Sequence, residues 1–533
     1  MIRALSVDAV RAAEAAALAG LPEGELMARA ARGLAEVAVA RLTDTEGATV
    51  VGLVGAGDNG GDTLYAVAHL AESGFPCAVV LVPTSGRDGV HAAGLEAAEA
   101  AGVMVHVASD DPDAAADVVA EADLVLDGIV GIGGRLGLRP EAAQLVDAVD
   151  DDAWVIAVDL ASGLDPAGES GEDDAVWADE TVTFGTPKPV HLLPVGEAAT
   201  GRLTVVDIGL DFDDVPAAVE RLTWDDVADL WPVPGRGDDK YSRGVLGVVA
   251  GSEAYPGAAV LCTTAAAESG VGMVRYVGTP TPVALVHQAV PEAVVGDGRV
   301  QAWVVGPGLD TEADDDRARA QLDSARAALG SDLPVVVDAG GLALVDGRRD
   351  APTVLTPHAG ELARLLTRLE RPGAGTTDGQ QSGSGDSASV AGGELPAVRP
   401  ADHVAPSDRE VTADDVKADP LAHARRLVAL TGATVLLKGA TTLVVTDGEP
   451  VRSQADAPPW LATAGSGDVL AGVIGTLLAA GCAPHDAASL GALVHGVAAD
   501  RTSGGGPLRA LAVAHGIRPT VRDLLARGRS APG

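Results

Sequence analysis

Short valine-rich runs alternate with alanine-rich helical stretches along most of the chain, and this alternation constrains the fold more than any other feature. Short apolar runs between helices are typical of parallel strands covered by helices on both faces of the sheet. In the first half the runs lie at residues 49–54, 77–82, 124–126, 154–158 and 203–206. Apolar residues at helical spacing between residues 7 and 42, interrupted by Gly20-Leu21-Pro22, predict two helices before the first strand.

The alternation lapses once and then restarts, which predicts two domains. Asp, Trp and Pro replace it at residues 224–234, and further apolar runs follow at residues 244–250, 303–305, 335–337, 354–355, 434–437 and 442–445. The 533 residues also exceed the roughly 250–300 at which one core stops growing. We expect an α/β domain at residues 1–225, a linker at 226–235 and a second α/β domain at 236–530. Residues 371–411, dominated by Gly, Ser, Asp, Thr and Pro, are predicted to be a disordered surface insertion.

Charge and cysteine content argue against several classes of partner and location. A formal net charge of −39 opposes binding to nucleic acid or to anionic membranes. The three cysteines, Cys77, Cys262 and Cys482, are scattered, which supports neither disulfides nor a zinc cluster. The apolar stretch at 469–480 is shorter than the ~20 residues that span a bilayer, and Asp8 and Glu14 interrupt the region of a secretory signal. We expect a soluble, cytoplasmic protein.

Lysine is nearly absent, although Asp and Glu together number 76. This composition resembles adaptation to high salt, and a GC-rich genome would also favour Arg over Lys. The whole set is Lys188, Lys240, Lys417 and Lys438, and three of these four lie in the motifs below. A phosphate-bearing ligand therefore has to be held by local groups.

Three apolar runs of the first half are followed by loops with acidic or amide side chains. Residues 55–62 read Gly-Ala-Gly-Asp-Asn-Gly-Gly-Asp, Asp127 precedes a flexible loop that contains Arg135, and residues 159–165 read Asp-Leu-Ala-Ser-Gly-Leu-Asp. Open α/β sheets bind ligands at the carboxyl ends of their strands, and a glycine-rich turn lets helix amides approach a phosphate. Any one loop could be a turn or a helix cap, but the three together favour a binding site.

These loops resemble, in order, the Asn-Asn-Gly-Gly-Asp, Asp-X-X-Phe-Gly-X-Gly and Asp-Ile-Pro-Ser-Gly segments of the NAD(P)H-hydrate epimerase family, whose closing strands resemble residues 181–189 and 207–210. The resemblance implies a Rossmann-like three-layer α/β/α domain. It implies that the damaged dinucleotide is cradled by Asp58, Asn59, Gly60, Gly61 and Asp62, and by Gly131, Ile132, Gly133, Gly134, Arg135, Leu136 and Gly137. It further implies a potassium ion held by Asn59, Asp127 and Ser162, with Asp159 facing the nicotinamide ring.

The sequence departs from that family pattern at Asp58, Val130 and Ala161, where Asn, Phe and Pro are usual. A carboxylate at position 58 would repel a phosphate unless a cation lies between them. The implied reaction inverts C6 of the hydrated ring, so a hydroxyl leaves and returns on the other face through a cationic ring nitrogen. A nearby carboxylate can act as acid and base and can stabilise that cation, and Asp159 is the candidate.

The second half ends its motifs with Gly465-Ser466-Gly467-Asp468 at the start of a long apolar helix. This arrangement combines backbone amides and a helix dipole, which bind an anion, with a carboxylate that can accept a proton from an attacking hydroxyl. It is typical of ribokinase-like phosphoryl transfer. Lys438, retained in a lysine-poor chain, is expected to meet a phosphate as a point charge.

Further segments complete a resemblance to the ADP/ATP-dependent NAD(P)H-hydrate dehydratase family, which has a ribokinase-like α/β fold. They are Lys-X-X-Arg-Gly at 240–244, Tyr-Pro-Gly-Ala at 255–258, Gly-Pro-Gly at 306–308, Thr-Pro-His-X-X-Glu at 356–361 and Leu-Lys-Gly-Ala at 437–440. The resemblance implies that the hydrate contacts Ala258, Gly308, His358 and Asp468. It implies that an adenine nucleotide, ADP in most bacterial and archaeal members, is held by Lys438, Gly439, Ala440, Thr441, Thr442 and Gly467.

In the implied dehydration the nucleotide phosphorylates the C6 hydroxyl, and loss of phosphate restores the ring double bond. Asp468 would be the base, and magnesium is expected on the phosphates. His358 could orient the substrate or carry a proton, or it could be a hydrogen-bonded core residue. The two halves would together repair NADHX and NADPHX, since the epimerase supplies the S form that the dehydratase accepts. We also expect a homo-oligomer.

Two other functions are compatible with parts of the pattern. The second half could be a ribokinase-like kinase for a vitamin precursor, fused to a non-catalytic dinucleotide-binding module. The first half alone could be a dinucleotide-sensing or partner-binding module without activity. Thr-Pro-His at 356–358 and Asp-Asn-Gly-Gly-Asp at 58–62 argue against the kinase, and turnover of the R epimer would decide the second alternative.

Overall fold

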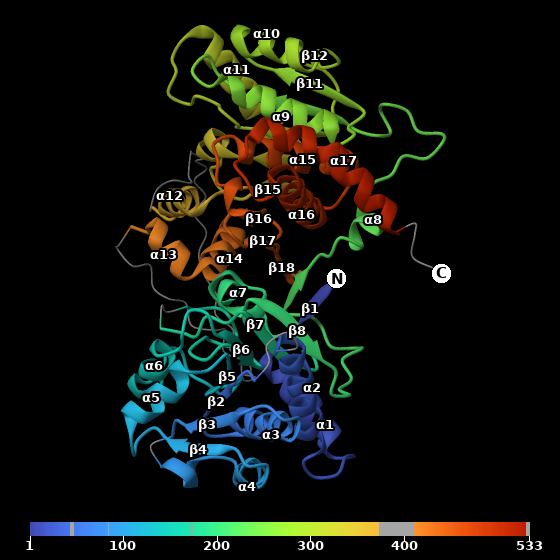
Figure 1. Cartoon of the computed structure of the whole chain (residues 1–533). Coiled ribbons are helices and arrows are strands. Elements are labelled where there is room, and N and C mark those ends of the chain that lie inside the picture. Colours follow the sequence, from blue (N-terminus) through green and yellow to red (C-terminus); the bar gives the residue numbers. More distant parts are fainter. Residues whose placement is uncertain (43–46, 84, 172–173, 372–409, 529–533) are drawn as a thin grey trace, which may run out of the picture.

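The chain folds into two α/β units, each built around its own sheet (Figure 1). The structure is a computed structural model that describes residues 1–42, 47–83, 85–171, 174–371 and 410–528. The predicted insertion at residues 371–411 therefore lies outside the described residues, apart from its ends. In the part of the chain that is described, no helix has the length and apolar character needed to cross a membrane.

The first unit holds a seven-stranded sheet in which every paired strand is parallel. Its order is β4-β3-β2-β5-β6-β7-β8. The strands are β2 (Val50–Val54), β3 (Cys77–Leu81), β4 (Met104–Val107), β5 (Leu124–Gly128), β6 (Trp154–Val158), β7 (Glu180–Phe184) and β8 (Arg202–Val206). The five strands predicted from apolar runs in this half are confirmed, and residues 181–184 lie in β7. Residues 207–210, compared with the closing strands of the family, follow β8 and do not form a strand. The edge strand β4 was not predicted, and it is only partly buried: His106 interrupts its apolar run, and Met104 is 62% exposed.

Helices cover both faces of this sheet, which confirms the predicted three-layer α/β/α arrangement. Helices α2 (Glu25–Leu42), α3 (Asp58–Glu72) and α4 (Ala92–Ala100) share one core with the sheet, and α5 (Pro112–Ala120) and α6 (Pro140–Asp147) share another. Helix α1 (Val7–Leu18) precedes α2, as the interrupted helical pattern predicts. The binding loops therefore leave the sheet at one edge, between the two helical layers.

The second unit holds an eleven-stranded mixed sheet with the order β1-β9-β18-β17-β16-β15-β14-β13-β10-β11-β12. The strands that belong to the second half are β10 (Val245–Val249), β11 (Met273–Val277), β12 (Val294–Val295), β13 (Ala302–Val305), β14 (Val335–Val337), β15 (Thr353–Leu355), β16 (Thr434–Leu437), β17 (Thr442–Val445) and β18 (Val451–Gln454). Across the sheet, the neighbouring strands between β16 and β12 in this order are all parallel. Strand β17 runs antiparallel to both β16 and β18.

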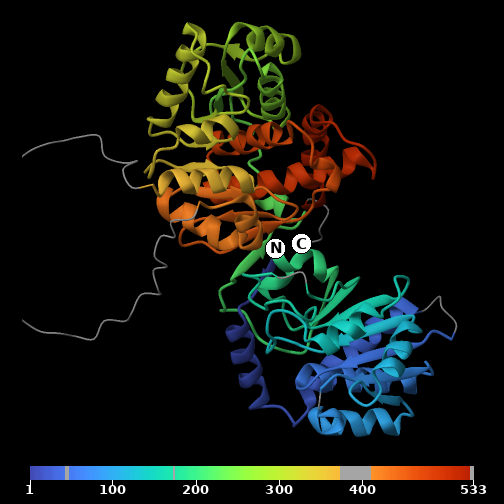
Figure 2. The same ribbon diagram turned by 90° about the vertical axis from the view of Figure 1, so that its left-hand side faces the viewer.

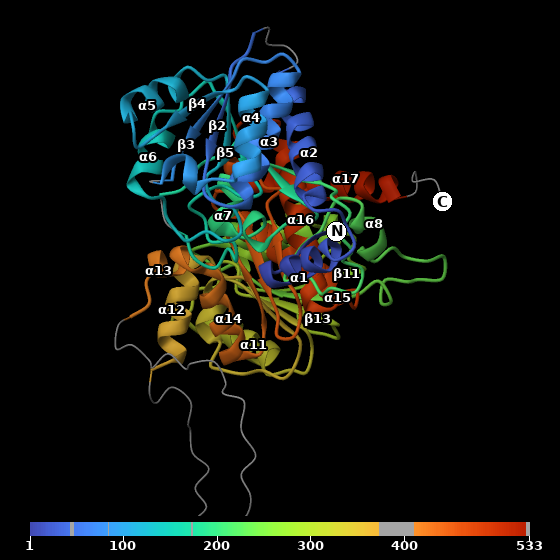
Figure 3. The same ribbon diagram turned by 90° about the horizontal axis from the view of Figure 1, so that it is seen from below.

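Two helical layers enclose this sheet as well (Figure 3). One core includes α8 (Asp226–Leu230), α9 (Pro256–Glu268), α10 (Pro280–Ala289), α15 (Ser466–Ala479), α16 (Pro484–Ser503) and α17 (Ala510–Gly528), and the other includes α11 (Asp316–Leu329), α12 (Ala359–Leu369), α13 (Ala413–Ala418) and α14 (Pro420–Thr431). Small side chains permit close packing, since a Cβ added at Gly472 of α15 would lie 2.4 Å from the carbonyl oxygen of Cys262 in α9.

The sheet of the second unit includes two strands from the first 225 residues. Strand β9 (Val219–Arg221) pairs in parallel with β18, and β1 (Ile2–Ala4) pairs antiparallel with β9. The N-terminus consequently lies at the junction of the two units (Figure 2), where the ammonium group of Met1 is 2.8 Å from Asp226. Both strands lie inside the range 1–225 that the sequence pattern assigns to the first domain. Strands of three residues carry too little periodicity to reveal their sheet.

Candidate active sites

A cavity of about 640 Å³ lies at the carboxyl ends of β2, β5 and β6 in the first unit. Those strands are neighbours in the sheet, so the three predicted loops meet there. Of the predicted residues, the cavity is lined by Asp58, Asn59, Asp62, Gly131, Ile132, Gly133, Gly134, Arg135, Gly137 and Asp159. Gly60, Gly61 and Leu136 belong to the same loops without lining it. The loops touch because Gly55 has no side chain: a Cβ there would lie 1.7 Å from the carbonyl oxygen of Ile129.

Asp159 follows β6 and is held by a buried network. Its Oδ1 accepts hydrogen bonds from Lys188 Nζ at 2.5 Å and Thr183 Oγ1 at 3.0 Å, and its backbone has a positive φ of 67°. Burial alone would raise the pKa of Asp159, but the Lys188 ammonium outweighs it and the pKa lies below its ordinary value. Asp159 is therefore an ionised carboxylate in a strained backbone conformation.

His191 fixes the main chain at Asp159. Its Nδ1 accepts a hydrogen bond from the backbone amide of Lys188 at 3.1 Å, so Nε2 is the donor to the carbonyl oxygen of Asp159, 2.9 Å away. Burial lowers the pKa of His191 to about 4, so the ring is neutral at physiological pH. A neutral imidazole thus supports a left-handed backbone that a residue other than glycine rarely adopts.

Two further carboxyl groups line the same cavity in different electrostatic surroundings. Burial, followed by the negative charges of Asp159 and Asp58, raises the pKa of Asp62 well above its ordinary value. Burial likewise raises the pKa of Glu14. Carboxyl groups whose environments separate their pKa values in this way can divide the roles of acid and base.

Two of the predicted potassium ligands, Asp127 and Ser162, meet at the end of β5, where Asp127 is fully buried. Asp127 accepts hydrogen bonds from Ser162 Oγ at 2.7 Å and from the Ser162 amide at 2.8 Å. Burial raises the pKa of Asp127 to about 6, so a nearby cation would favour its ionised form. The buried Nδ2 of Asn59 has no hydrogen-bond partner among the described residues. Carboxylate, hydroxyl and amide oxygens are ligands of hard cations, so this donor set fits potassium.

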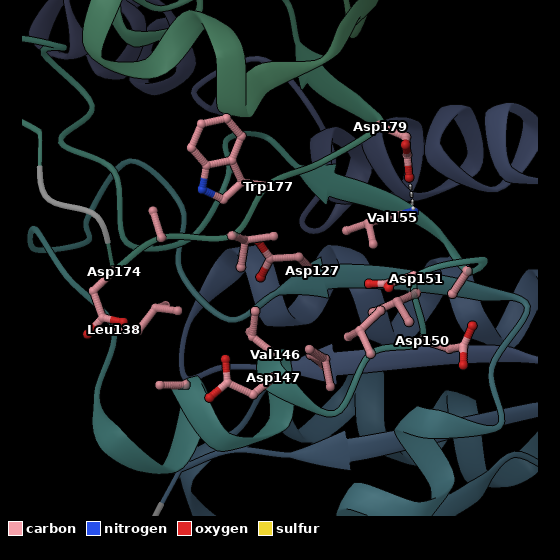
Figure 4. A pocket seen from close by; sticks show the side chains of 17 residues that line it. Asp127, Leu138, Val146, Asp147, Asp150, Asp151, Val155, Asp174, Trp177 and Asp179 are labelled. Carbon is pink, nitrogen blue, oxygen red and sulfur yellow. Dashed lines mark hydrogen bonds between the residues drawn. The ribbon is translucent and has the colours of Figure 1, made fainter.

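A second cavity of the first unit, about 450 Å³ in volume, is also lined by Asp127 (Figure 4). It lies between α6 and the chain segments at residues 149–155 and 174–179. Its walls include Trp177 and five further carboxyl side chains, those of Asp147, Asp150, Asp151, Asp174 and Asp179. None of the glycine-rich phosphate loops lines it. An acidic wall repels a pyrophosphate, which distinguishes this second cavity from the larger cavity with its glycine-rich loops and Arg135.

In the second unit a cavity of about 700 Å³ lies between the β16–β17 hairpin loop and the start of α15. It is lined by the predicted residues His358, Lys438, Gly439, Ala440, Thr442 and Gly467. Asp468, Ala258 and Gly308 do not line it, but the last two meet each other, since a Cβ added at Gly308 would lie 2.5 Å from Ala258 Cβ. Thr441 is also turned away from the cavity, and its hydroxyl contacts Glu197 of the first unit.

Opposite charges surround the start of α15. Lys438 Nζ lies 2.7 Å from Asp338 Oδ1 and 3.6 Å from Glu361 Oε2. Burial alone would lower the pKa of Lys438, but these carboxylates raise it above its ordinary value. Burial, and then the charge of Asp338, raises the pKa of Asp468 to about 7. A carboxylate with a pKa near 7 is suited to accept a proton at neutral pH.

His358 is the N-cap of α12 and is not a core residue, since its side chain is 54% exposed. Its Nδ1 accepts hydrogen bonds from the amides of Gly360 at 3.1 Å and Glu361 at 3.3 Å. The cap occupies Nδ1, so Nε2 is the nitrogen that is available to a ligand in the cavity.

Several site residues were not among the sequence predictions. Lys188 and His191 support Asp159, Asp338 pairs with Lys438, and His495 lines the second cavity. Lys188 carried a usable signal, because it is one of four lysines and follows a strand. The partners of Asp159 and Lys438 lie 29 and 100 residues away, so no local pattern indicates those pairs.

The fold and the two cavities define a two-domain α/β protein with a dinucleotide-type site in one unit and a phosphoryl-transfer-type site in the other. Two family profiles match it: YjeF-related protein N-terminus over residues 23–190, and NAD(P)H-hydrate dehydratase over residues 246–388 and 409–506. The chain belongs to the family of bifunctional NAD(P)H-hydrate repair enzymes.

Similar proteins span nearly the same length. The bifunctional NAD(P)H-hydrate repair enzyme Nnr of Mycobacterium tuberculosis is 43% identical over 501 residues, covering 91% of this chain and 90% of that protein. The enzyme of the same name from Mycobacterium leprae is 43% identical and covers 93% of each chain. Among solved structures, the ADP/ATP-dependent NAD(P)H-hydrate dehydratase from Bacillus subtilis, co-crystallised with ATP and Mg²⁺, is 21% identical with a TM-score of 0.45, covering 57% of this chain and 99% of that one.

Proposed function

We propose that the chain repairs hydrated NADH and NADPH by two activities, an epimerase in the first unit and a nucleotide-dependent dehydratase in the second. The observation that carries this proposal is that matches to both families cover the loops of both cavities in one chain. The first unit interconverts R- and S-NAD(P)HX at C6, and the second converts the S form to NAD(P)H. No observation favours the vitamin-kinase alternative.

In the first unit the dinucleotide would lie against the amides at the start of α3 and against the loop at 131–137. Arg135 is the candidate partner for a phosphate. Asn59, Asp127 and Ser162 would hold potassium, which would supply positive charge next to Asp127 and Asp58. The domain boundaries at 225 and 236 stay a proposal, with β1 and β9 crossing to the second sheet.

Epimerisation requires the C6–O bond to break while the ring nitrogen lone pair forms a C=N bond. Asp159, kept ionised by Lys188, would stabilise the resulting cation and accept the proton of the returning water. Asp62 is the candidate donor of the proton that lets the hydroxyl leave as water, since burial and the neighbouring carboxylates favour its protonated form. Re-addition of water on the opposite face inverts the centre.

In the second unit Lys438, Gly439, Ala440, Thr442 and Gly467, which line the cavity, would hold ADP, with Thr441 supporting their loop. The hydrate would contact Ala258, Gly308, His358 and Asp468, of which His358 lines the same cavity. Asp468 accepts the proton of the C6 hydroxyl as that oxygen attacks the terminal phosphoryl group, which releases AMP. The ring nitrogen then expels phosphate from C6, and loss of a C5 proton restores the double bond. Magnesium bound to the phosphates would offset their charge.

One assay tests both activities. The purified chain is mixed with both epimers of hydrated NADH, ADP and magnesium in potassium salt, and the near-ultraviolet absorbance of NADH is followed. Recovery of NADH from both epimers, dependent on nucleotide, is the expected result. Recovery that stops when the S form is consumed would leave the first unit as a binding module, and no recovery with ADP or ATP would overturn the proposal. The expected homo-oligomer is tested by light scattering of the same sample.

A further inference from the structure

A carboxylate of the first unit contacts the hairpin loop that lines the cavity of the second unit. The side chain of Thr441, which is only 6% exposed, donates a hydrogen bond from Oγ1 to Glu197 Oε2 at 3.2 Å. Glu197 belongs to α7 (Pro194–Thr200), and Figure 1 shows this helix at the junction of the two units. The two residues are 244 positions apart in the sequence, so this contact exists only because the units are docked.

The other oxygen of Glu197 is anchored to the second sheet. Its Oε1 pairs with Arg221 of β9 at 3.2 Å, and the same guanidinium donates to Ser453 Oγ of β18 and to the carbonyl oxygen of Leu192. The Glu197 carboxylate therefore bridges β9 and Thr441. A charge held by an arginine that is itself fixed by several bonds loses little conformational freedom when it binds the loop.

Helix α7 itself is held against the second unit by apolar packing. Leu192 and Leu193, which lead into the helix, are each 1% exposed and belong to the same core as Val435 and Leu437 of β16. Burial of two leucines on this interface keeps the backbone that carries Glu197 at a fixed position relative to the hairpin.

The hairpin loop at residues 438–442 depends on such anchors. Lys438 is fixed at one end by Asp338, whereas Gly439 and Ala440 are exposed. Thr441 is the buried residue at the other end, immediately before β17. Its bond to Glu197 therefore sets the position of the exposed part of the loop over the cavity.

We infer that Glu197 is a positioning residue for the nucleotide loop, so that the first unit completes the nucleotide site of the second. The inference rests on the proposed assignment of residues 438–442 to the adenine nucleotide. It gives the fusion of the two units a structural role beyond the supply of S epimer, because the dehydratase site takes one of its supports from the epimerase unit.

The test is a double-mutant cycle in the full chain with Glu197→Ala, Thr441→Val and the double variant. ADP affinity is measured by calorimetry with magnesium, and dehydration of the S epimer gives KM for ADP and kcat. Loss of a hydrogen bond to a charged group predicts that Glu197→Ala weakens ADP binding about five- to tenfold, with kcat within about twofold. The double variant is expected to bind ADP no more weakly than Thr441→Val alone, because the two substitutions remove the same contact.

Glu169→Ala is the matched control, since Glu169 also pairs across the junction, with Arg425 at 3.1 Å, but does not touch the loop. Its ADP affinity should equal that of the wild type. Unchanged affinity in Glu197→Ala, equal weakening in Glu169→Ala, or additive effects in the cycle would overturn the inference. Wild-type protein that binds ADP without forming NADH would instead overturn the proposed function, and the affinity ratios would still decide the role of Glu197.

Discussion

At the scale of single residues, burial and neighbouring charges together set the pKa of one carboxyl group in each unit. Lys188 keeps Asp159 ionised although it is buried, whereas burial and Asp338 hold the pKa of Asp468 at about 7. The two groups therefore suit different tasks, namely stabilisation of a cation and transfer of a proton.

Asp468→Asn is predicted to abolish dehydration and to leave epimerisation intact, because only the base of the second unit is removed. General-base loss predicts a fall in kcat of at least about 10²-fold. In the wild type, kcat should rise with pH through about 7 and then level off, since the ionised form of Asp468 accepts the proton. An unimpaired dehydratase in this variant would contradict the assignment of the base.

Lys188→Met is predicted to impair epimerisation and to destabilise the first unit, because it leaves a buried carboxylate without its cation. In the wild type the pKa of Asp159 is lower in the folded than in the unfolded state, so its contribution to stability is present at neutral pH and is lost as pH falls through the folded pKa. In the variant burial raises that pKa instead. The expected cost is about 3 kcal/mol at neutral pH and shrinks on acidification.

Denaturant unfolding at two pH values measures this change. Lys417→Met is the control, because the Lys417 side chain is 68% exposed and pairs with Asp414 of its own helix, α13. It should leave both stability and its pH dependence unchanged. Equal stability of Lys188→Met and the wild type at neutral pH would show that the buried pair does not hold Asp159 ionised.

At the scale of elements, small residues allow the helices of the second unit to pack at short distance. Helix α15 carries the Gly-Ser-Gly-Asp segment at its start and packs along α9, so the contact between the helices positions this segment beside the cavity. The strands beneath them, β10, β13 and β14, have three to five residues, and their burial on both faces explains their continuous apolar sequences.

Gly472→Ala is predicted to destabilise the second unit by about 1–3 kcal/mol, because the new methyl group would overlap the backbone of α9. Chemical unfolding followed by circular dichroism measures the shift. Gly257→Ala, also in α9, has no atom within 4 Å of the added Cβ and should change stability by less than about 0.5 kcal/mol. A neutral effect of Gly472→Ala would mean that the helices can separate without cost.

At the scale of the whole molecule, β1 and β9 form one end of the second sheet, and the chain carries a net charge of −39. Self-repulsion on this scale opposes the compact state and is screened by salt. Strands β1 and β9 come from the chain segments that flank the first unit, and both pair into the second sheet. The two units are therefore joined by sheet pairing as well as by the connecting chain.

Stability is predicted to rise with salt concentration, and potassium should add a separate effect on the first unit. At equal ionic strength, replacing potassium chloride by tetramethylammonium chloride should lower the unfolding temperature of the first unit and the rate of epimerisation. The rate of dehydration should not change, since the bulky cation does not fit beside buried Asp127. Asp127→Asn should lose this difference. Equal transitions of the wild type in both salts would contradict a potassium site.

The sequence by itself determined the two α/β units and the loops that meet in each cavity. Parallel strands place their carboxyl ends at one edge, so a loop that follows an apolar run, such as residues 55–62 or 465–468, is located by local pattern alone. Only the tertiary structure decided which charges meet there, because the Asp159–Lys188, Asp338–Lys438 and Glu197–Thr441 contacts join residues 29, 100 and 244 positions apart. It also decided that β1 and β9 join the second sheet, because a strand of three residues is placed by its pairing partners and not by its own periodicity.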